Sequence, residues 1–175
     1  MNEKTLLPGN RECSHKFRTM PIKHPRCGQF VTPIKDVICY PLNIKYISQC
    51  IENFHQYFFN LPPDNDYIKW TVGKAMYMAD GTALKQKQAM DENGFYSDII
   101  SSSAVCTIMC DSINFDERQR KFTYYGTQLI KRRTRDLKRS MVTTGYIENV
   151  PRTQNNPHGL MITGWRTIEN KDLDY

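Results

Sequence analysis

The segment that decides the fold is residues 44–63, with the sequence IKYISQCIENFHQYFFNLPP. Its large apolar side chains recur at alternating intervals of three and four residues, which places them on one face of a helix. They are Ile44, Ile47, Ile51, Phe54, Phe58 and Leu61. Asn43 is a favourable N-cap, and the proline pair 62–63 cannot continue the helix. We therefore predict one long amphipathic helix that packs into a core.

Shorter helices are expected to follow it. A second helix is predicted to begin near Asp64 or Asp66 and to end at Gly81, with the apolar residues on one side. Those residues are Ile68, Val72, Ala75, Met76 and Ala79. Two further helical segments are expected at 83–92, closed by the Asn93-Gly94 pair, and at 95–102.

From residue 104 onward the sequence is typical of strands. The segments 104–113, 121–131, 138–147 and 159–168 are rich in Val, Ile, Thr, Tyr and Phe. Polar turns separate them at 114–117, 134–136 and 151–159. Helices followed by strands indicate an α+β fold, with the helices packed on one face of an antiparallel sheet.

Length and composition are consistent with one folded domain preceded by an arm. The chain has 175 residues, 39% hydrophobic and 24% charged, and a formal net charge of +6. Residues 1–40 lack periodicity and are predicted to be an irregular arm, with one edge strand over 30–40 because Pro33 suits only an edge. Neither a signal peptide nor a run of about 20 apolar residues is visible, so we expect a soluble polypeptide.

The arm contains four residues of types that bind zinc: Cys13, His15, His24 and Cys27. Their spacing matches no zinc module, which favours an irregular basic tail over a metal site. The six cysteines of the chain also follow no pattern typical of secreted domains. We expect no metal and no cofactor.

Motifs that carry enzyme chemistry are missing from the sequence. It has no P-loop, no dinucleotide-binding glycine motif, no metalloprotease helix motif and no nucleophile elbow. His55 lies on the first helix with no acid or nucleophile matched to it by spacing, which favours a partly buried structural histidine. We therefore predict a protein that is not an enzyme.

Residues 118–139 contain nine cations against one acid, Asp136, and include Tyr124 and Tyr125. Aromatic and cationic side chains on one strand could bind single-stranded nucleic acid, and the cations could instead bind an acidic protein or lipid surface. The alternative is that cations at strand ends solvate turns and protect sheet edges. The cations cluster at predicted turns, so this alternative is favoured.

Five blocks of the sequence resemble the TraK family of conjugative transposons. They are residues 54–64, 74–77, 94–96, 122–128 and 155–159, in the same order, within a match that runs from about residue 41 to the C-terminus. TraK in turn is similar to the eighth VirB-type component of type IV secretion systems. That component shares an Asn-Pro-x-Gly turn before its last strand, which here is Asn156, Pro157, His158 and Gly159.

The resemblance implies a non-enzymatic subunit of a conjugation apparatus. Residues 41–175 would form an NTF2-like domain, with N-terminal helices packed on a curved four-stranded antiparallel sheet, on the periplasmic side of the inner membrane. The protein would self-associate into a homo-oligomer and contact other subunits of the channel that carries DNA between cells. The family carries a membrane-spanning helix before this domain, which residues 1–40 do not supply.

The turn at 156–159 is the predicted partner-binding site. Pro157 fixes φ near −65°, Gly159 can adopt a positive φ, and Asn156 can bond the backbone two residues on. Such a rigid turn could dock a neighbouring subunit, or it could only steer the chain into the last strand. An NTF2-like domain could instead bind a small molecule between helices and sheet, but the segments there supply mainly Ile, Phe, Met and Tyr.

Overall fold

The computed structural model describes residues 22–23, 30–31 and 43–173. The chain divides into two compact units, Met1–Pro41 and Leu42–Tyr175. In the first unit, the short strands β1 (Ile22–Lys23) and β2 (Phe30–Val31) pair in antiparallel fashion. The rest of the strand predicted over 30–40 lies outside the described residues, as do the four candidate zinc ligands of the arm.

The second unit begins with the long helix that the apolar spacing predicts. Helix α1 (Ile44–Phe59) is capped by Asn43, whose side chain accepts a 3.1 Å hydrogen bond from the backbone N–H of Lys45. The next helix, α2 (Asn65–Met76), is capped in the same way by Asp64, which accepts from the N–H of Tyr67 at 2.8 Å. Two shorter helices follow, α3 (Gly81–Glu92) and α4 (Phe95–Ser101).

The predicted end of the second helix at Gly81 is wrong, because α2 ends at Met76 and Gly81 begins α3. The physical reason is Asp80, whose carboxylate caps α3 by accepting from the backbone N–H of Thr82 at 2.9 Å. The same carboxylate accepts from the N–H of Gly164 at 3.0 Å, which ties the start of α3 to the last strand.

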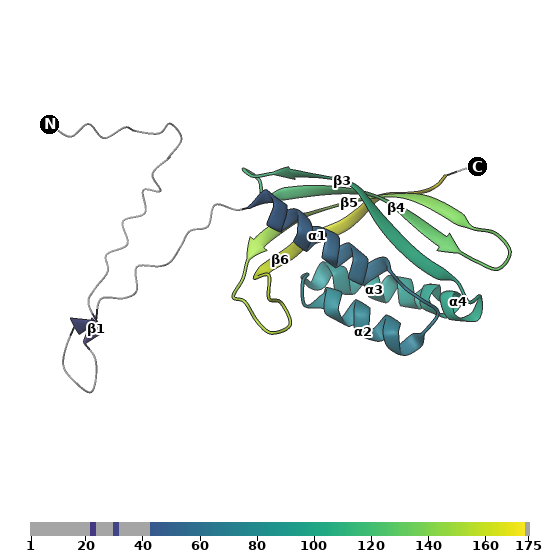
Figure 1. Ribbon diagram of the computed structural model, residues 1–175, viewed down its shortest axis with the longest axis horizontal. Coiled ribbons are helices and arrows are strands. Elements are labelled where there is room, and N and C mark those ends of the chain that lie inside the picture. Colours follow the sequence, from purple (N-terminus) through teal and green to yellow (C-terminus); the bar gives the residue numbers. More distant parts are fainter. Residues whose placement is uncertain (1–21, 24–29, 32–42, 174–175) are drawn as a thin grey trace. The chain divides into compact units, whose positions relative to one another are not determined.

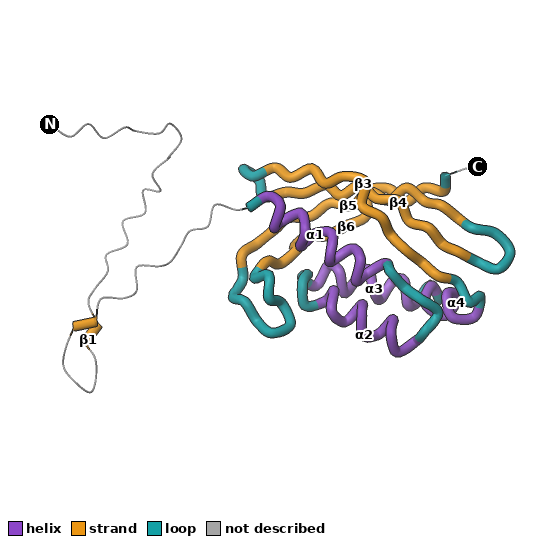
Figure 2. Tube along the Cα trace, in the orientation of Figure 1, coloured by secondary structure: helices purple, strands orange, loops and turns teal. Residues whose placement is uncertain are grey.

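Four long strands form the sheet. They are β3 (Val105–Asp116), β4 (Lys121–Lys131), β5 (Leu137–Asn149) and β6 (Leu160–Asp172), and all neighbours are antiparallel in the order β3-β4-β5-β6. Register shifts interrupt β3 once and the β5–β6 pairing twice. Such bulges bend strands and increase their twist. Figures 1 and 2 show the curved sheet with the helices on one of its faces.

The prediction of an α+β fold with helices on one face of a four-stranded antiparallel sheet is therefore confirmed. The first predicted turn of the sheet is shifted along the chain, since β3 continues to Asp116. Asp116 accepts hydrogen bonds from the backbone N–H groups of Arg118 and Gln119, so the turn lies at 117–120.

The core lies between α1 and the sheet. Ile47, Ile51, Phe54 and Phe58 are fully buried on the inner face of α1, while Ile44, predicted on the same face, is 46% exposed at the helix start. Trp165 of β6 packs edge-to-face on Phe54, with 5.1 Å between the ring centroids. Aromatic rings thus fill the space in which an NTF2-like domain could hold a ligand.

Candidate partner-binding site

The loop between β5 and β6 ends in a closed turn at residues 156–159. The backbone N–H of Gly159 donates to the carbonyl oxygen of Asn156 at 3.3 Å, and Gly159 has a φ of +64°. The predicted tight turn with a positive φ at Gly159 is thus present. A β-carbon at that position would lie 2.7 Å from Cγ of Arg152 and 3.1 Å from the carbonyl oxygen of Val150.

Asn156 stabilises the turn differently from the prediction. Its buried side-chain amide donates to the carbonyl oxygen of Leu160 at 2.9 Å, four residues on instead of two. Its backbone N–H donates to the hydroxyl oxygen of Thr153 at 3.0 Å, and its carbonyl oxygen accepts from the N–H of Thr153 at 3.1 Å. The turn is therefore bonded on both sides to the loop and to the first residue of β6.

His158 faces helix α1 instead of standing free in solvent. Its ring lies 5.4 Å from the ring of Tyr46, between centroids, and its Nε2 lies 3.4 Å from Nδ2 of Asn53. The hydroxyl of Tyr46 donates to the carbonyl oxygen of His158 at 3.0 Å. Partial burial, and secondarily the charge of Arg152, lower the pKa of His158. Pro157 is the exposed member of the turn.

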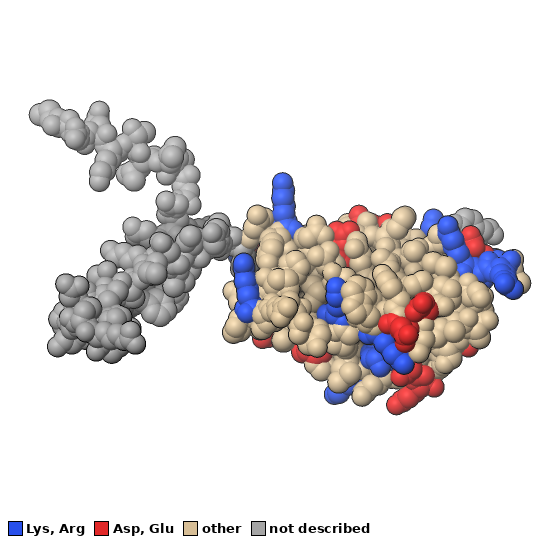
Figure 3. Space-filling view, turned by 60° about the horizontal axis from the view of Figure 1, so that its bottom comes forward, with Lys and Arg blue, Asp and Glu red and all other residues tan. Residues whose placement is uncertain are grey.

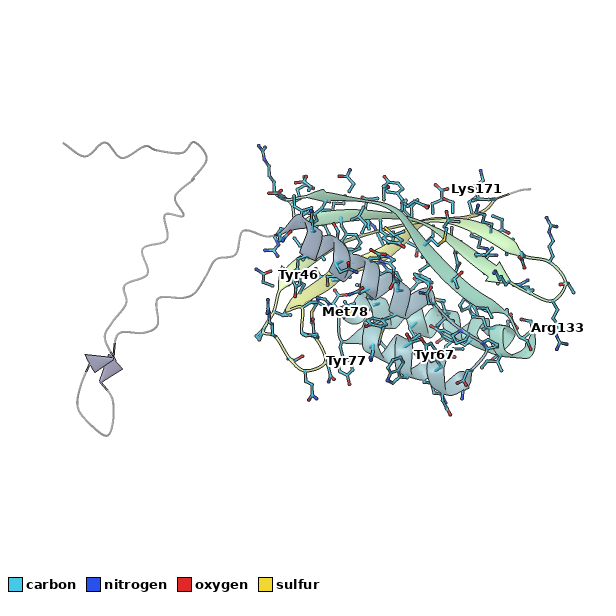
Figure 4. All side chains as sticks on the ribbon, in the orientation of Figure 1. Tyr46, Tyr67, Tyr77, Met78, Arg133 and Lys171 are labelled. Carbon is cyan, nitrogen blue, oxygen red and sulfur yellow. The ribbon has the colours of Figure 1, made fainter. Side chains whose placement is uncertain are left out.

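We call the exposed area formed by Tyr46, Pro157 and His158 the turn–helix surface. Figure 4 shows Tyr46 near the start of α1, on the side of the β5–β6 loop. Residues more than 100 positions apart form it, so sequence reasoning found the turn but missed Tyr46 and Asn53. A rigid, hydrogen-bonded turn braced on a helix can present a fixed contact patch to another protein.

The basic run of residues 118–139 does not form one continuous surface. Arg118 and Arg120 lie at the β3–β4 turn, while 131–135 lie at the β4–β5 turn, at the other end of an 11-residue strand. At about 3.4 Å per residue that strand separates the two groups by roughly 35 Å. Figure 3 shows Lys and Arg atoms gathered at the end of the domain that carries the β4–β5 turn, with others spread over the rest of this face.

The two tyrosines of the run also point to opposite faces of the sheet. Tyr124 is fully buried and stacks on His55 at 3.8 Å between ring centroids, whereas Tyr125 is 41% exposed. They cannot form the aromatic platform that the nucleic-acid hypothesis needs.

His55 is fully buried, more deeply than predicted, and its hydrogen bonds are satisfied. Its Nδ1–H donates to the carbonyl oxygen of Ile51 at 2.7 Å, and its Nε2 accepts from the hydroxyl of Thr143 on β5 at 2.7 Å. Burial lowers the pKa of His55 to about 3, against a smaller opposite effect of the Ile51 bond. The imidazole is therefore neutral at physiological pH and serves the packing of the core.

This burial predicts a loss of stability in mild acid. The unfolded histidine titrates near pH 6.5 and the folded one near 3, so the unfolded state binds more protons between these values. The contribution of the buried, neutral His55 to the free energy of unfolding is fully present above pH 6.5 and declines as the pH falls. We expect denaturant titration to show about 1–2 kcal/mol less stability at pH 5 than at pH 7.

The control is His55→Gln, which keeps a polar group but cannot take up a proton. The variant should show a flatter dependence of unfolding free energy on pH between 7 and 5. An unchanged slope in the variant would assign the loss to other groups.

Within the described ranges, no group of three His, Cys, Asp or Glu side chains is placed to hold a metal ion. In the same ranges, no helix is long and apolar enough to span a membrane.

No family model and no curated protein matches the chain. Solved structures do match. VirB8 of Agrobacterium tumefaciens has a TM-score of 0.61 at 10% identity, over 75% of this chain and 94% of that one. The soluble domain of TrwG from Bartonella grahamii has a TM-score of 0.58 at 15% identity, over 74% of this chain and 94% of that one. TraE in complex with 2-(2-furyl)isonicotinic acid has a TM-score of 0.60 at 12% identity, over 74% of this chain and 96% of that one. The chain therefore has the NTF2-like fold of VirB8-type components of type IV secretion systems.

Proposed function

We propose that this protein is a non-enzymatic subunit of a type IV secretion apparatus and acts through protein–protein contacts. The observation that carries the proposal is the likeness to VirB8 and TrwG over nearly the whole length of those chains. The filled core and the neutral, fully bonded His55 support a binding role over catalysis. Fold alone does not determine function, so the role needs its own test.

In its finer form, the proposal is that the chain belongs to the TraK type of conjugative transposon. Its domain at 41–175 would lie on the periplasmic side of the inner membrane, form homo-oligomers and bind other subunits. Deleting the gene in donor cells should abolish transfer, and the intact gene supplied in trans should restore it. Copurification from those cells should recover secretion subunits. Normal transfer without the gene would refute the role.

The turn–helix surface is the proposed contact site of this subunit. Pro157→Glu adds a charge at the exposed position, while the turn geometry tolerates most residues there. Losing the proline ring should lower the free energy of unfolding by only about 0.4–1 kcal/mol. Burying an unpaired charge in an interface costs far more, so we expect transfer to fall by about tenfold or more.

The matched control is Gln88→Glu, which adds the same charge at an exposed position on α3, outside the turn–helix surface. It should leave transfer unchanged. Thermal melts of both variants separate loss of contact from loss of folding. Normal transfer by a folded Pro157→Glu protein would show that the turn only steers the chain into β6.

A further inference from the structure

A small pocket lies between α4 and the end of the sheet, away from the turn–helix surface. Its volume is about 210 Å³. Ile99 of α4, Ala104, Cys106 of β3 and Ile130 of β4 form its apolar lining, and each is at most 3% exposed. These residues supply the apolar part of the lining, at the end of the sheet that carries the β4–β5 turn, and Asp98, Ser102 and two arginines supply the polar part.

Two arginines line the same pocket. The described residues provide no hydrogen bond or ion pair for the exposed guanidinium of Arg132. Arg139 donates through Nε to a carboxylate oxygen of Asp172 at 2.5 Å, which uses one of its five N–H groups. Figure 4 shows the neighbouring Arg133 at this end of the molecule.

The charge of the arginines reaches the interior of the pocket. Burial raises the pKa of the Cys106 thiol to about 11, and Arg132 and Arg139 act in the opposite direction. Asp98 is the one acid among the residues that line the pocket, and Asp172 pairs with Arg139 beside it, so two carboxylates balance the two guanidinium groups there. The excess of positive charge at this end comes from the exposed Lys131, Arg133 and Arg135 next to the pocket, against Asp136.

We propose that this pocket binds an acidic peptide segment of a partner protein, with one apolar side chain inside it and adjacent carboxylates on Arg132 and Arg139. The volume of about 210 Å³ is below the roughly 300–1,000 Å³ of pockets for drug-sized molecules and suits a single side chain. Guanidinium groups pair with carboxylates through two parallel hydrogen bonds. Asp98 can accept from the backbone N–H of such a segment. The inference does not depend on the proposed role in secretion.

The test is a titration of the full chain, ¹³C-labelled at Ile and Ala methyl groups, with three synthetic peptides. They are acetyl-Glu-Phe-Glu-amide, its Gln-Phe-Gln analogue and its Glu-Ala-Glu analogue. We expect the first to shift the methyl signals of Ile99, Ala104 and Ile130 and to bind about tenfold more tightly than either analogue, because each analogue lacks one half of the interaction.

Two variants locate the site. Arg132→Gln should weaken binding of the Glu-Phe-Glu peptide by about fivefold or more, while Arg118→Gln, the same change at the other end of β4, should not. Ser102→Phe places a ring at the exposed rim of the pocket and should abolish binding. Both affected positions are at the surface, so the fold should persist, as a melt will verify.

Several results would overturn the proposal. If the Glu-Ala-Glu peptide binds as tightly as the Glu-Phe-Glu peptide, the apolar side chain contributes nothing and the interaction rests on charge alone. Shifts confined to residues outside the pocket would place the site elsewhere. If an oligodeoxythymidylate shifts signals around Arg132 and the peptides do not, this end of the sheet is a nucleic-acid surface and not a peptide site.

Discussion

Replacing Phe54 with alanine should lower the free energy of unfolding by about 3–5 kcal/mol. Phe54 is fully buried on α1, and its ring contacts the rings of His55, Phe58 and Trp165. Truncation removes the transfer energy of the aromatic ring and leaves a cavity, because neighbours fixed by edge-to-face contacts cannot collapse fully into it. Denaturant titration followed by circular dichroism measures the loss.

The matched control is Ile44→Ala on the same helix. Ile44 belongs to the same three-and-four spacing but is 46% exposed at the first turn, so we expect a loss below about 1 kcal/mol. Similar losses for Phe54→Ala and Ile44→Ala would mean that α1 is rotated relative to the sheet described above.

Gly159→Val should impair folding and, under the proposed function, DNA transfer as well. A β-branched residue resists the φ of +64°, and its β-carbon would meet the side chain of Arg152 and the carbonyl oxygen of Val150. We expect a loss of about 2–4 kcal/mol, from backbone strain and the displaced neighbours together. Because the strain distorts the turn–helix surface, transfer should fall more than the loss of folded protein explains.

Gly164→Val separates the effect of backbone strain from the effect of distorting the turn–helix surface. Gly164 on β6 has a similar φ of +59°, but a β-carbon there would meet only the ring of Tyr146, at 3.4 Å or more. The strain is comparable and lies outside the turn. If Gly164→Val reduces transfer as much as Gly159→Val at equal levels of folded protein, the turn has no special role in docking.

Local signals predict most of the fold and little of the site's surroundings. The spacing in α1, its Asn43 cap and the strand-rich second half each act over a few residues, and each appears in the structure. The predicted end of α2 at Gly81 is wrong because glycine is suited to the position after a helix, whereas the capping Asp80 before it favours the start of the next helix. The further bond of Asp80 to Gly164 joins residues 84 positions apart and leaves no local signal.

The candidate site likewise has one part with a local sequence signal and another part without one. The turn was visible in the order Asn-Pro-x-Gly, because proline and glycine restrict or permit specific backbone angles. The contacts of His158 with Tyr46 and Asn53 depend on how α1 lies across the sheet, which no spacing reveals. The same applies to the basic run, whose contiguity in sequence is lost when β4 separates its two ends.

The buried bond between His55 and Thr143 has a consequence for the exposed turn. Apolar contacts tolerate small slips of a helix, but this bond between α1 and β5 is directional and joins polar atoms in an apolar core. Sliding α1 by one residue would move it about 1.5 Å along its axis and turn it by about 100°, breaking the bond. The same slip would carry Tyr46 and Asn53 away from His158. The buried His55 thus fixes the position of α1 along its own axis. By doing so it also sets where Tyr46 and Asn53, on the outer face of α1, meet the turn at His158.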